Sequence, residues 1–155
     1  MNPRSLAAYT GLLALTFAAP ALAAFFPGPG DWYAGLNKPT WNPPGWVFGP
    51  VWTLLYLLMA TAAWRVWRRT GLRSRPLALY GLQLAFNAAW TPVFFGARAI
   101  GPALILLLLL LAALLATVAA FRRVDRAAAC LLAPYLAWSG FATCLNFTLW
   151  RLNSP

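Results

Sequence analysis

The stretch that decides the fold is Pro102 to Phe121, PALILLLLLLAALLATVAAF, which contains no charged residue. A helix rises about 1.5 Å per residue, so a run of this length reaches across the roughly 30 Å hydrocarbon core of a bilayer. A strand of a membrane barrel would instead alternate apolar and polar residues over about 10 positions. We therefore predict a membrane-spanning helix whose Leu/Ala composition makes it a lipid-facing scaffold.

Four further apolar runs of similar length fill most of the chain. The 155 residues are 62% hydrophobic and 9% charged, and a soluble domain could not bury so much apolar surface. The predicted helices cover residues 6–26, 46–66, 76–96, 102–121 and 127–150, and an external loop covers residues 27–45. The sequence thus predicts an all-α fold, an integral membrane bundle of five transmembrane helices that forms a single domain over residues 1–155.

The first run has a second interpretation. Arg4, the apolar core and the tripeptide Ala21-Leu22-Ala23 follow the order of a cleavable signal peptide. The run continues through Phe25 and Phe26, which makes it long enough to span and remain. Both interpretations stay open, and detection of Arg4 in the mature protein would decide between them.

Charge predicts the orientation of the bundle. Lys and Arg number 12 against two acidic residues, for a net charge of +10. If the helices alternate in direction, nine cations share one side: Arg4, Arg65, Arg68, Arg69, Arg73, Arg75, Arg122, Arg123 and Arg126. The positive-inside rule then places the N-terminus in the cytoplasm and the C-terminus outside, which favours a bacterial cytoplasmic membrane over an outer membrane. Because these residues follow apolar spans, membrane lipids are the expected partner, and nucleic acid is not.

The missing residue types exclude several kinds of chemistry. Without His, the chain has no His-based catalytic triad and no His ligand for a metal or haem, so we predict no metal site. Asp31 and Asp125 are isolated from each other, and no ionisable group lies near the middle of a span, which argues against proton coupling. Cys130 and Cys144 lie about 21 Å apart along one helix and cannot pair there.

Neutral polar and aromatic residues share faces of the predicted helices. Gln83, Asn87 and Thr91 recur every four residues beside Trp90, and burying amides in lipid is costly, so this face should point into the protein. The same spacing recurs at Trp138, Ala142 and Asn146 on the fifth helix, while Trp52 and Tyr56 lie one turn apart on the second. These residues predict either a pocket for a flat ligand or interhelical hydrogen bonds that hold the bundle together.

Prolines and small residues add local predictions. Pro92 is expected to bend the third helix and Pro134 the fifth. Gly81, Ala85 and Ala89 form a row of small residues that predicts a dimer seam. The loop residues around Trp32 and Tyr33 form either a lid over the bundle or an interfacial aromatic belt.

Three segments carry a family resemblance: WYAGLNKPTWNPPGWVFGPVWTLLY at 32–56, LQLAFNAAWTPVFFG at 82–96 and PYLAWSGFATCLNFTLWRLN at 134–153. They closely resemble the tryptophan-rich sensory protein/translocator protein family, also known as the peripheral-type benzodiazepine receptor family. The resemblance covers roughly residues 25–153.

This resemblance implies a homodimeric five-helix bundle that binds porphyrins such as protoporphyrin IX. In many members, cholesterol and isoquinoline or benzodiazepine-type ligands also bind. The matching ligand-binding positions are Trp32, Tyr33, Trp52, Asn87, Trp90, Trp138, Ala142 and Asn146, and the seam maps to Gly81, Ala85 and Ala89. The family's sterol sequence corresponds to Leu145, Phe147 and Arg151, with Phe in place of the usual Tyr.

The resemblance and the residues together predict a membrane receptor or sensor with a role in tetrapyrrole or stress regulation. Porphyrin is its ligand and no cofactor is required; aromatic rings stack on the macrocycle, while Asn87 and Trp N–H groups orient its polar edge. One alternative is a light-dependent porphyrin-degrading enzyme in which Trp52 and Trp138 exchange electrons with the ligand. The other is a transporter of porphyrin or sterol.

Overall fold

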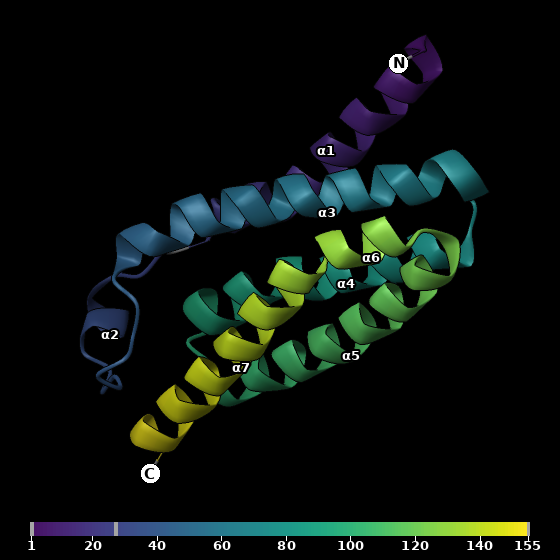
Figure 1. Ribbon diagram of the computed structural model, residues 1–155. Coiled ribbons are helices and arrows are strands. Elements are labelled where there is room, and N and C mark those ends of the chain that lie inside the picture. Colours follow the sequence, from purple (N-terminus) through teal and green to yellow (C-terminus); the bar gives the residue numbers. More distant parts are fainter. Residues whose placement is uncertain (1, 27, 155) are drawn as a thin grey trace.

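The computed structural model describes residues 2–26 and 28–154, and every regular element in them is a helix (Figure 1). The elements in chain order are α1 (Pro3–Ala23), α2 (Asp31–Ala34), η1 (Gly45–Val47), α3 (Phe48–Thr70), α4 (Arg75–Thr91), η2 (Pro92–Gly96), α5 (Ile100–Val124), α6 (Arg126–Leu131) and α7 (Ala133–Asn153). Each of the five predicted helices coincides with a helical stretch. Residue 27, where the predicted loop begins, lies outside the described residues.

Three of these stretches are long and apolar enough to cross a membrane by length and composition, namely Gly45–Thr70, Ile100–Val124 and Arg126–Asn153. The all-α membrane fold is therefore confirmed. The helices α1 and α4 complete the bundle beside these three stretches, and their own crossing stays a prediction. The 17 residues of α4 continue directly into η2, which lengthens that helical stretch.

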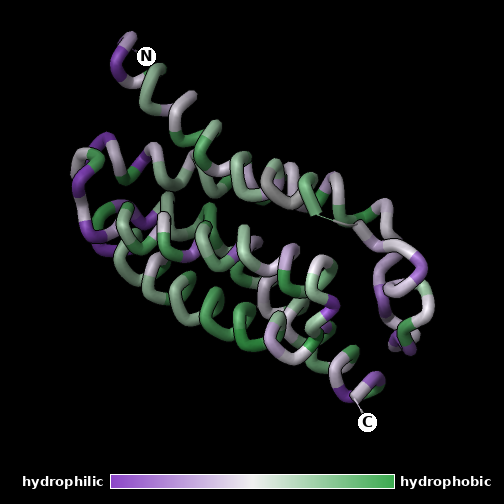
Figure 2. The backbone as a smooth tube through the Cα atoms, turned by 180° about the vertical axis from the view of Figure 1, so that it is seen from behind, coloured by the Kyte–Doolittle hydropathy of each residue, from purple (hydrophilic) through white to green (hydrophobic). Residues whose placement is uncertain are grey.

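The prediction of a lipid-facing scaffold helix is incomplete, because one side of α5 is buried in the bundle. α5 packs against both α4 and α7, and its buried side chains recur at helical spacing. They are Ala103, Leu107, Leu110, Ala113, Leu114, Thr117 and Phe121. Ile105, Leu108 and Leu115 on its other face are exposed. A helix that is apolar all round has no polar stripe to mark its outer face, so its sequence does not reveal the side that packs inward (Figure 2).

The distance between α3 and the last helix grows along the bundle. Near the α3–α4 connection, α3 packs against α6, and Ala62 and Ala63 of α3 are buried in the same core as Ala128 and Ala129 of α6. Beyond Leu132, α7 turns away from α3 toward the end of the bundle that carries α2 (Figure 1). Small side chains thus allow close approach at one end, and the other end is left open.

The α-helical pattern is interrupted at both predicted prolines. Pro134 follows a break at Leu132 that separates α6 from α7. After Thr91, the chain enters the π-helical turn η2, in which the Ala97 N–H donates to the Pro92 carbonyl at 2.8 Å. Proline lacks an N–H and crowds the preceding turn, so the regular hydrogen-bond ladder ends at both positions.

Asp125, which directly follows α5, connects α3 to α6 at the close-packed end. One carboxylate oxygen accepts the Ala127 N–H at 2.9 Å, which caps α6, and the other accepts Arg65 Nε of α3 at 3.0 Å. Arg69 Nη2 lies 3.6 Å from that second oxygen. Burial alone would raise the pKa of Asp125, but the backbone N–H groups of Ala128 and Ala127 and the charges of Arg65 and Arg69 outweigh it, so the pKa lies below its ordinary value.

The first helix is attached to α3 by side-chain hydrogen bonds. Trp64 Nε1 donates to the Ser5 carbonyl at 3.2 Å, and the Tyr9 hydroxyl lies 3.1 Å from that of Thr61. In the candidate cleavage sequence Ala21-Leu22-Ala23, the side chains of the last two residues lie outside the described residues. Cleavage stays a prediction.

Candidate functional site

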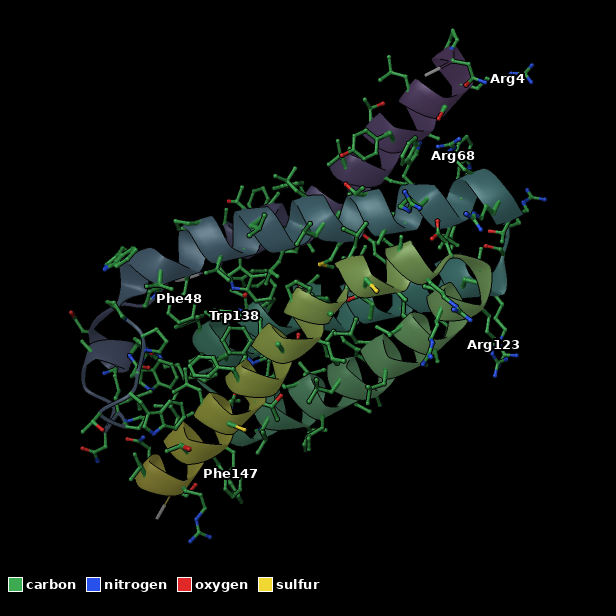
Figure 3. The ribbon with its side chains drawn as sticks, viewed as in Figure 1. Arg4, Phe48, Arg68, Arg123, Trp138 and Phe147 are labelled. Atoms are coloured by element: carbon green, nitrogen blue, oxygen red, sulfur yellow. The ribbon has the colours of Figure 1, made fainter. Side chains whose placement is uncertain are left out.

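A cavity of about 350 Å³ lies where α3 and α7 diverge. Its walls come from five helices, α1, α3, α4, α5 and α7. The lining side chains are mostly aromatic or small: Phe48, Trp52, Tyr56, Trp90, Trp138, Ala19 and Ala142. Figure 3 shows Phe48 on α3 and Trp138 on α7 on the two sides of the space between these helices, and their ring centroids are 5.8 Å apart at 75°. The bundle therefore encloses an aromatic space at this end.

A second cavity, of about 340 Å³, lies between the first one and the loop. Phe48, Trp52, Trp90, Thr91 and Ala142 line both cavities, so the two are neighbours separated by a shared wall. The lining of the second cavity also includes loop residues and residues of the C-terminal half of α7.

The structure brings seven of the eight predicted ligand-binding residues to these cavities. Trp52, Asn87, Trp90, Trp138 and Ala142 line the first, and Tyr33 and Asn146 line the second. Trp32 lines neither and instead packs edge-on against Phe94, with 5.6 Å between ring centroids. Its place is therefore behind the wall of the site, where it supports Phe94.

The amide of Asn87 is occupied by protein groups. Tyr56 Oη donates to Asn87 Oδ1 at 2.9 Å, and Asn87 Nδ2 donates to Tyr135 Oη at 3.0 Å. Tyr135 is completely buried. For Asn87, the interhelical hydrogen-bond alternative is therefore the arrangement observed, and α3, α4 and α7 are tied together at the cavity wall.

Asn146 has the same role nearer to the loop. Trp90 Nε1 donates to Asn146 Oδ1 at 3.1 Å, and Asn146 Nδ2 donates to the Ile100 carbonyl at 2.9 Å. The indole N–H of Trp90 is consequently used inside the bundle. These two asparagine networks hold the walls of the cavities and leave little polar capacity for a ligand.

The polar groups that remain are few. Among residues 2–26 and 28–154, neither Trp52 Nε1 nor Trp138 Nε1 makes a hydrogen bond, and the buried hydroxyl of Ser139 has no partner. All three side chains line the first cavity. Trp52 also stacks on Tyr56, with 5.2 Å between centroids and 24° between planes. Polar contacts to a bound molecule would come from these three groups and from the hydroxyl of Thr91, which lines both cavities.

The sequence-based set of binding residues omitted several contributors, and three of them show what signal was available. Phe48 lines both cavities one turn before Trp52, and that spacing was the available signal. Ser139 lies directly after Trp138. Tyr135 could not have been found from spacing, because its role depends on its contact with Asn87 of another helix.

The long loop covers the outer end of the second cavity. The Asn37 N–H donates to Asn153 Oδ1 at 2.9 Å, and Asn153 Nδ2 donates back to the Asn37 carbonyl at 2.9 Å. Lys38 Nζ lies 4.7 Å from the ring centroid of Tyr33, and burial raises the pKa of that tyrosine. This section of the loop forms the expected cover. Trp46, at 76% exposure, instead fits an aromatic belt.

The remaining predicted residues lie away from the cavities or divide between faces. Gly81 and Ala85 are exposed on α4 and Ala89 is half-buried, which leaves the seam open to a second copy, and dimer formation stays a prediction. Leu145 is buried while Phe147 is 48% exposed and points away from the bundle (Figure 3), so the sterol sequence is split between two faces of α7. Cys130 and Cys144 are free, as predicted.

Known proteins are similar to this chain over most of its length. The sequence pattern of the TspO/MBR family matches residues 10–151. The chain is 52% identical to the Translocator protein of Homo sapiens over 126 residues, which cover 79% of this chain and 75% of that protein. It is 47% identical to the Tryptophan-rich sensory protein of Cereibacter sphaeroides, over 87% of this chain and 85% of that protein. Protein CrtK of Rhodobacter capsulatus is 38% identical, over 86% and 84% of the two chains.

Proposed function

This chain belongs to the TspO/MBR family, and from that premise we propose that it is a membrane receptor or sensor that binds a porphyrin such as protoporphyrin IX. The ligand occupies the two neighbouring cavities among the helices. Its binding reports on tetrapyrrole levels or stress. The names of the relatives, a translocator protein and a sensory protein, support a role in handling or detecting a small molecule.

The observation that carries this proposal is the aromatic wall shared by the two cavities. A porphyrin is flat, rigid and mainly apolar, and it gains most from burial between aromatic faces. Phe48, Trp52 and Trp90 lie on that wall, and Trp138 of the first cavity packs edge-on against Phe48. Sterols and benzodiazepine-type ligands share the apolar character and are further candidates for the same space.

The polar edge of the ligand meets the side chains of Trp52, Thr91, Trp138 or Ser139, because the amides of Asn87 and Asn146 are bonded within the protein. This revises the expected role of Asn87, which positions the walls through Tyr56 and Tyr135. No His is present to act as an axial ligand, so a metal-free porphyrin is favoured over haem.

The decisive test fills the cavity space with a larger side chain on the shared wall. Ala142 lines both cavities, and Ala142→Phe would place a ring in the space required by the ligand. We expect protoporphyrin IX, titrated by its absorbance band, to bind at least about tenfold more weakly. The matched control is Ala112→Phe on the exposed face of α5, which lines neither cavity. Equal affinity in wild type and Ala142→Phe would contradict the proposal.

A second pair of variants distinguishes a residue that contacts the ligand from one that holds the cavity wall. Trp138→Phe removes an unpaired N–H and part of a stacking face, so a several-fold loss of affinity is expected, whereas the exposed Trp46→Phe should change nothing. Asn87→Ala removes a network of hydrogen bonds and should lower stability more than affinity. Unchanged affinity in Trp138→Phe would count against the site.

The enzyme alternative rests on the contact between Trp52 and Tyr56. Stacked aromatic side chains beside a light-absorbing ligand could exchange electrons with it, with dioxygen as the oxidant. Illumination of the purified protein with bound protoporphyrin IX, followed for new absorbance bands, tests this alternative. Tight binding without product would leave the receptor and the transporter as alternatives. To distinguish them, porphyrin flux into sealed vesicles that contain the protein is compared with flux into vesicles without it.

A further inference from the structure

The end of the bundle opposite the cavities is strongly basic. We call it the arginine end, and it consists of the nine cations Arg4, Arg65, Arg68, Arg69, Arg73, Arg75, Arg122, Arg123 and Arg126. Within residues 2–26 and 28–154 the ion pairs are two, from Arg65 and Arg69, and both go to Asp125. The other arginines of this end lack a carboxylate partner there and would attract an anion.

Two apolar grooves meet at this end. The first, of about 360 Å³, runs between α4 and α5, where Leu79 and Ala116 form its walls and Arg75 and Arg123 its charged end. The second, of about 550 Å³, lies on the other flank of α5 and combines Leu115 with Arg122, Arg123 and Arg126. Ala119 and Arg123 line both grooves.

This geometry has the two components of a phospholipid site. Arginine forks hold phosphate oxygens with two parallel hydrogen bonds, and the apolar walls below them accept acyl chains. Ala119 is small and exposed, so it leaves room for two chains that diverge on either side of α5. The grooves continue into the exposed apolar face of α5, with Leu108 above Leu115, where lipid chains would already lie.

We propose that these grooves bind one anionic phospholipid, with its phosphate at Arg123 and Arg75 and one acyl chain in each groove. The uncompensated charge selects a headgroup with net negative charge, such as phosphatidylglycerol, over zwitterionic phosphatidylcholine. The site is separate from the porphyrin cavities and does not depend on their function. In Figure 3, Arg123 projects from the α5 side of the bundle, whereas Arg4 and Arg68 project from the α1–α3 side of the same end.

The test counts lipids bound to the purified full chain by native mass spectrometry. Phosphatidylglycerol and phosphatidylcholine with identical acyl chains are titrated separately. One phosphatidylglycerol should bind about tenfold or more tightly than phosphatidylcholine, since each arginine near a lipid surface contributes about a factor of five. The double variant Arg75→Gln/Arg123→Gln should lose this preference, and Arg4→Gln/Arg68→Gln, with the same loss of charge at the same end, should retain it.

A steric variant tests the grooves without changing charge. Ala119→Trp would fill both grooves and should weaken phosphatidylglycerol binding about tenfold, while Ala112→Trp on the same helix should leave it unchanged. Circular dichroism verifies the helical fold of each variant, and if the double arginine variant does not fold, Ala119→Trp decides alone. Full binding by Ala119→Trp overturns the proposal, as does an equal loss of preference in Arg4→Gln/Arg68→Gln. Displacement of the lipid by equimolar inorganic phosphate overturns it as well, because the site would then bind soluble anions.

Discussion

The two ends of the bundle differ in how closely the same helices pack. At the arginine end, small residues such as Ala63 of α3 and Ala128 of α6 let helices approach, and both are fully buried. At the aromatic end, Phe48 and Trp138 stand between α3 and α7, and about 350 Å³ stays unfilled. The helices are therefore closely packed where side chains are small, and space for a ligand is left where they are large and rigid.

The polar side chains that join the helices also differ between the two ends. At the arginine end, Asp125 joins α3 to the start of α6 through charged hydrogen bonds. At the aromatic end, Asn87 and Asn146 join helices through neutral ones around an open space. A ligand site among membrane helices thus needs walls that are held by bonds, because close packing is not available to hold them.

Removing the charged connection should have the largest effect. Asp125→Ala loses a helix cap and leaves Arg65 without its partner, so we expect a loss of about 2–3 kcal/mol in the free energy of unfolding, since Arg65 is partly exposed. Unfolding in mixed micelles of detergent and dodecyl sulfate measures it. Asp31→Ala, at the exposed start of α2, is the control and should change stability by less than about 0.5 kcal/mol. Similar losses in both variants would contradict the role given to Asp125.

The same connection should make stability depend on pH. Because the pKa of Asp125 is lowered in the folded protein, its contribution is complete above the ordinary carboxyl pKa of about 4 and is lost as pH falls through the lowered value. Wild type should lose stability below about pH 4 relative to Asp125→Asn, which carries no such carboxyl group. Parallel stability profiles for the two proteins between pH 6 and pH 3 would refute this expectation.

Adding volume should distinguish the two ends directly. Ala128→Leu introduces three extra carbons at a fully buried position and should cost about 2 kcal/mol. Ala142→Leu adds the same volume beside the cavities and should cost less than about 0.5 kcal/mol, because the space exists. Chemical or thermal unfolding of the pair provides the comparison, and equal costs would mean that the aromatic end is as closely packed as the other.

Loss of one neutral hydrogen bond should have a smaller effect. Tyr135→Phe removes the acceptor of Asn87 Nδ2, and such bonds within membranes contribute about 0.6–1 kcal/mol. In a protein that already carries Asn87→Ala, the same change should cost much less. A double-mutant cycle measures this coupling energy, and additive effects would show that the two side chains act independently.

The smallest expected effect concerns the loop. Asn153→Ala removes both hydrogen bonds to Asn37 and should speed amide hydrogen exchange in residues 31–42 several-fold, with global stability unchanged. Ser154→Ala, which alters a bond only within its own helix end, is the neighbouring control. Equal exchange rates in the two variants would remove Asn153 as the residue that holds the loop.

Local sequence signals predicted the helices and their interruptions well. Long apolar runs located the helical stretches, and Pro92 and Pro134 marked where the α-helix gives way to η2 and to the break at Leu132. The resemblance to a known family selected residues that do gather at the cavities. These successes depend on periodicity and on proline geometry, both of which act within a few residues of the chain.

Relationships between helices could not be predicted in the same way. The repeated spacing of Asn87 and Asn146 indicated that they face inward, but their partners Tyr56, Tyr135 and the Ile100 carbonyl come from other helices. The inward side of α5 was hidden for a related reason, since Leu and Ala occupy all of its faces. Tertiary packing decides which of several equally apolar faces is buried, and spacing alone does not contain that information.

The paired hydrogen bonds between Asn37 and Asn153 also set an order of events during synthesis. The two residues are 116 positions apart, and all of the long helices from α3 to α7 lie between them. A chain leaving the ribosome at about 5–20 residues per second exposes Asn37 many seconds before its partner. The loop therefore cannot be held in place until α7 has emerged, and the mouth of the second cavity closes only after all of the helices from α3 to α7 have been made.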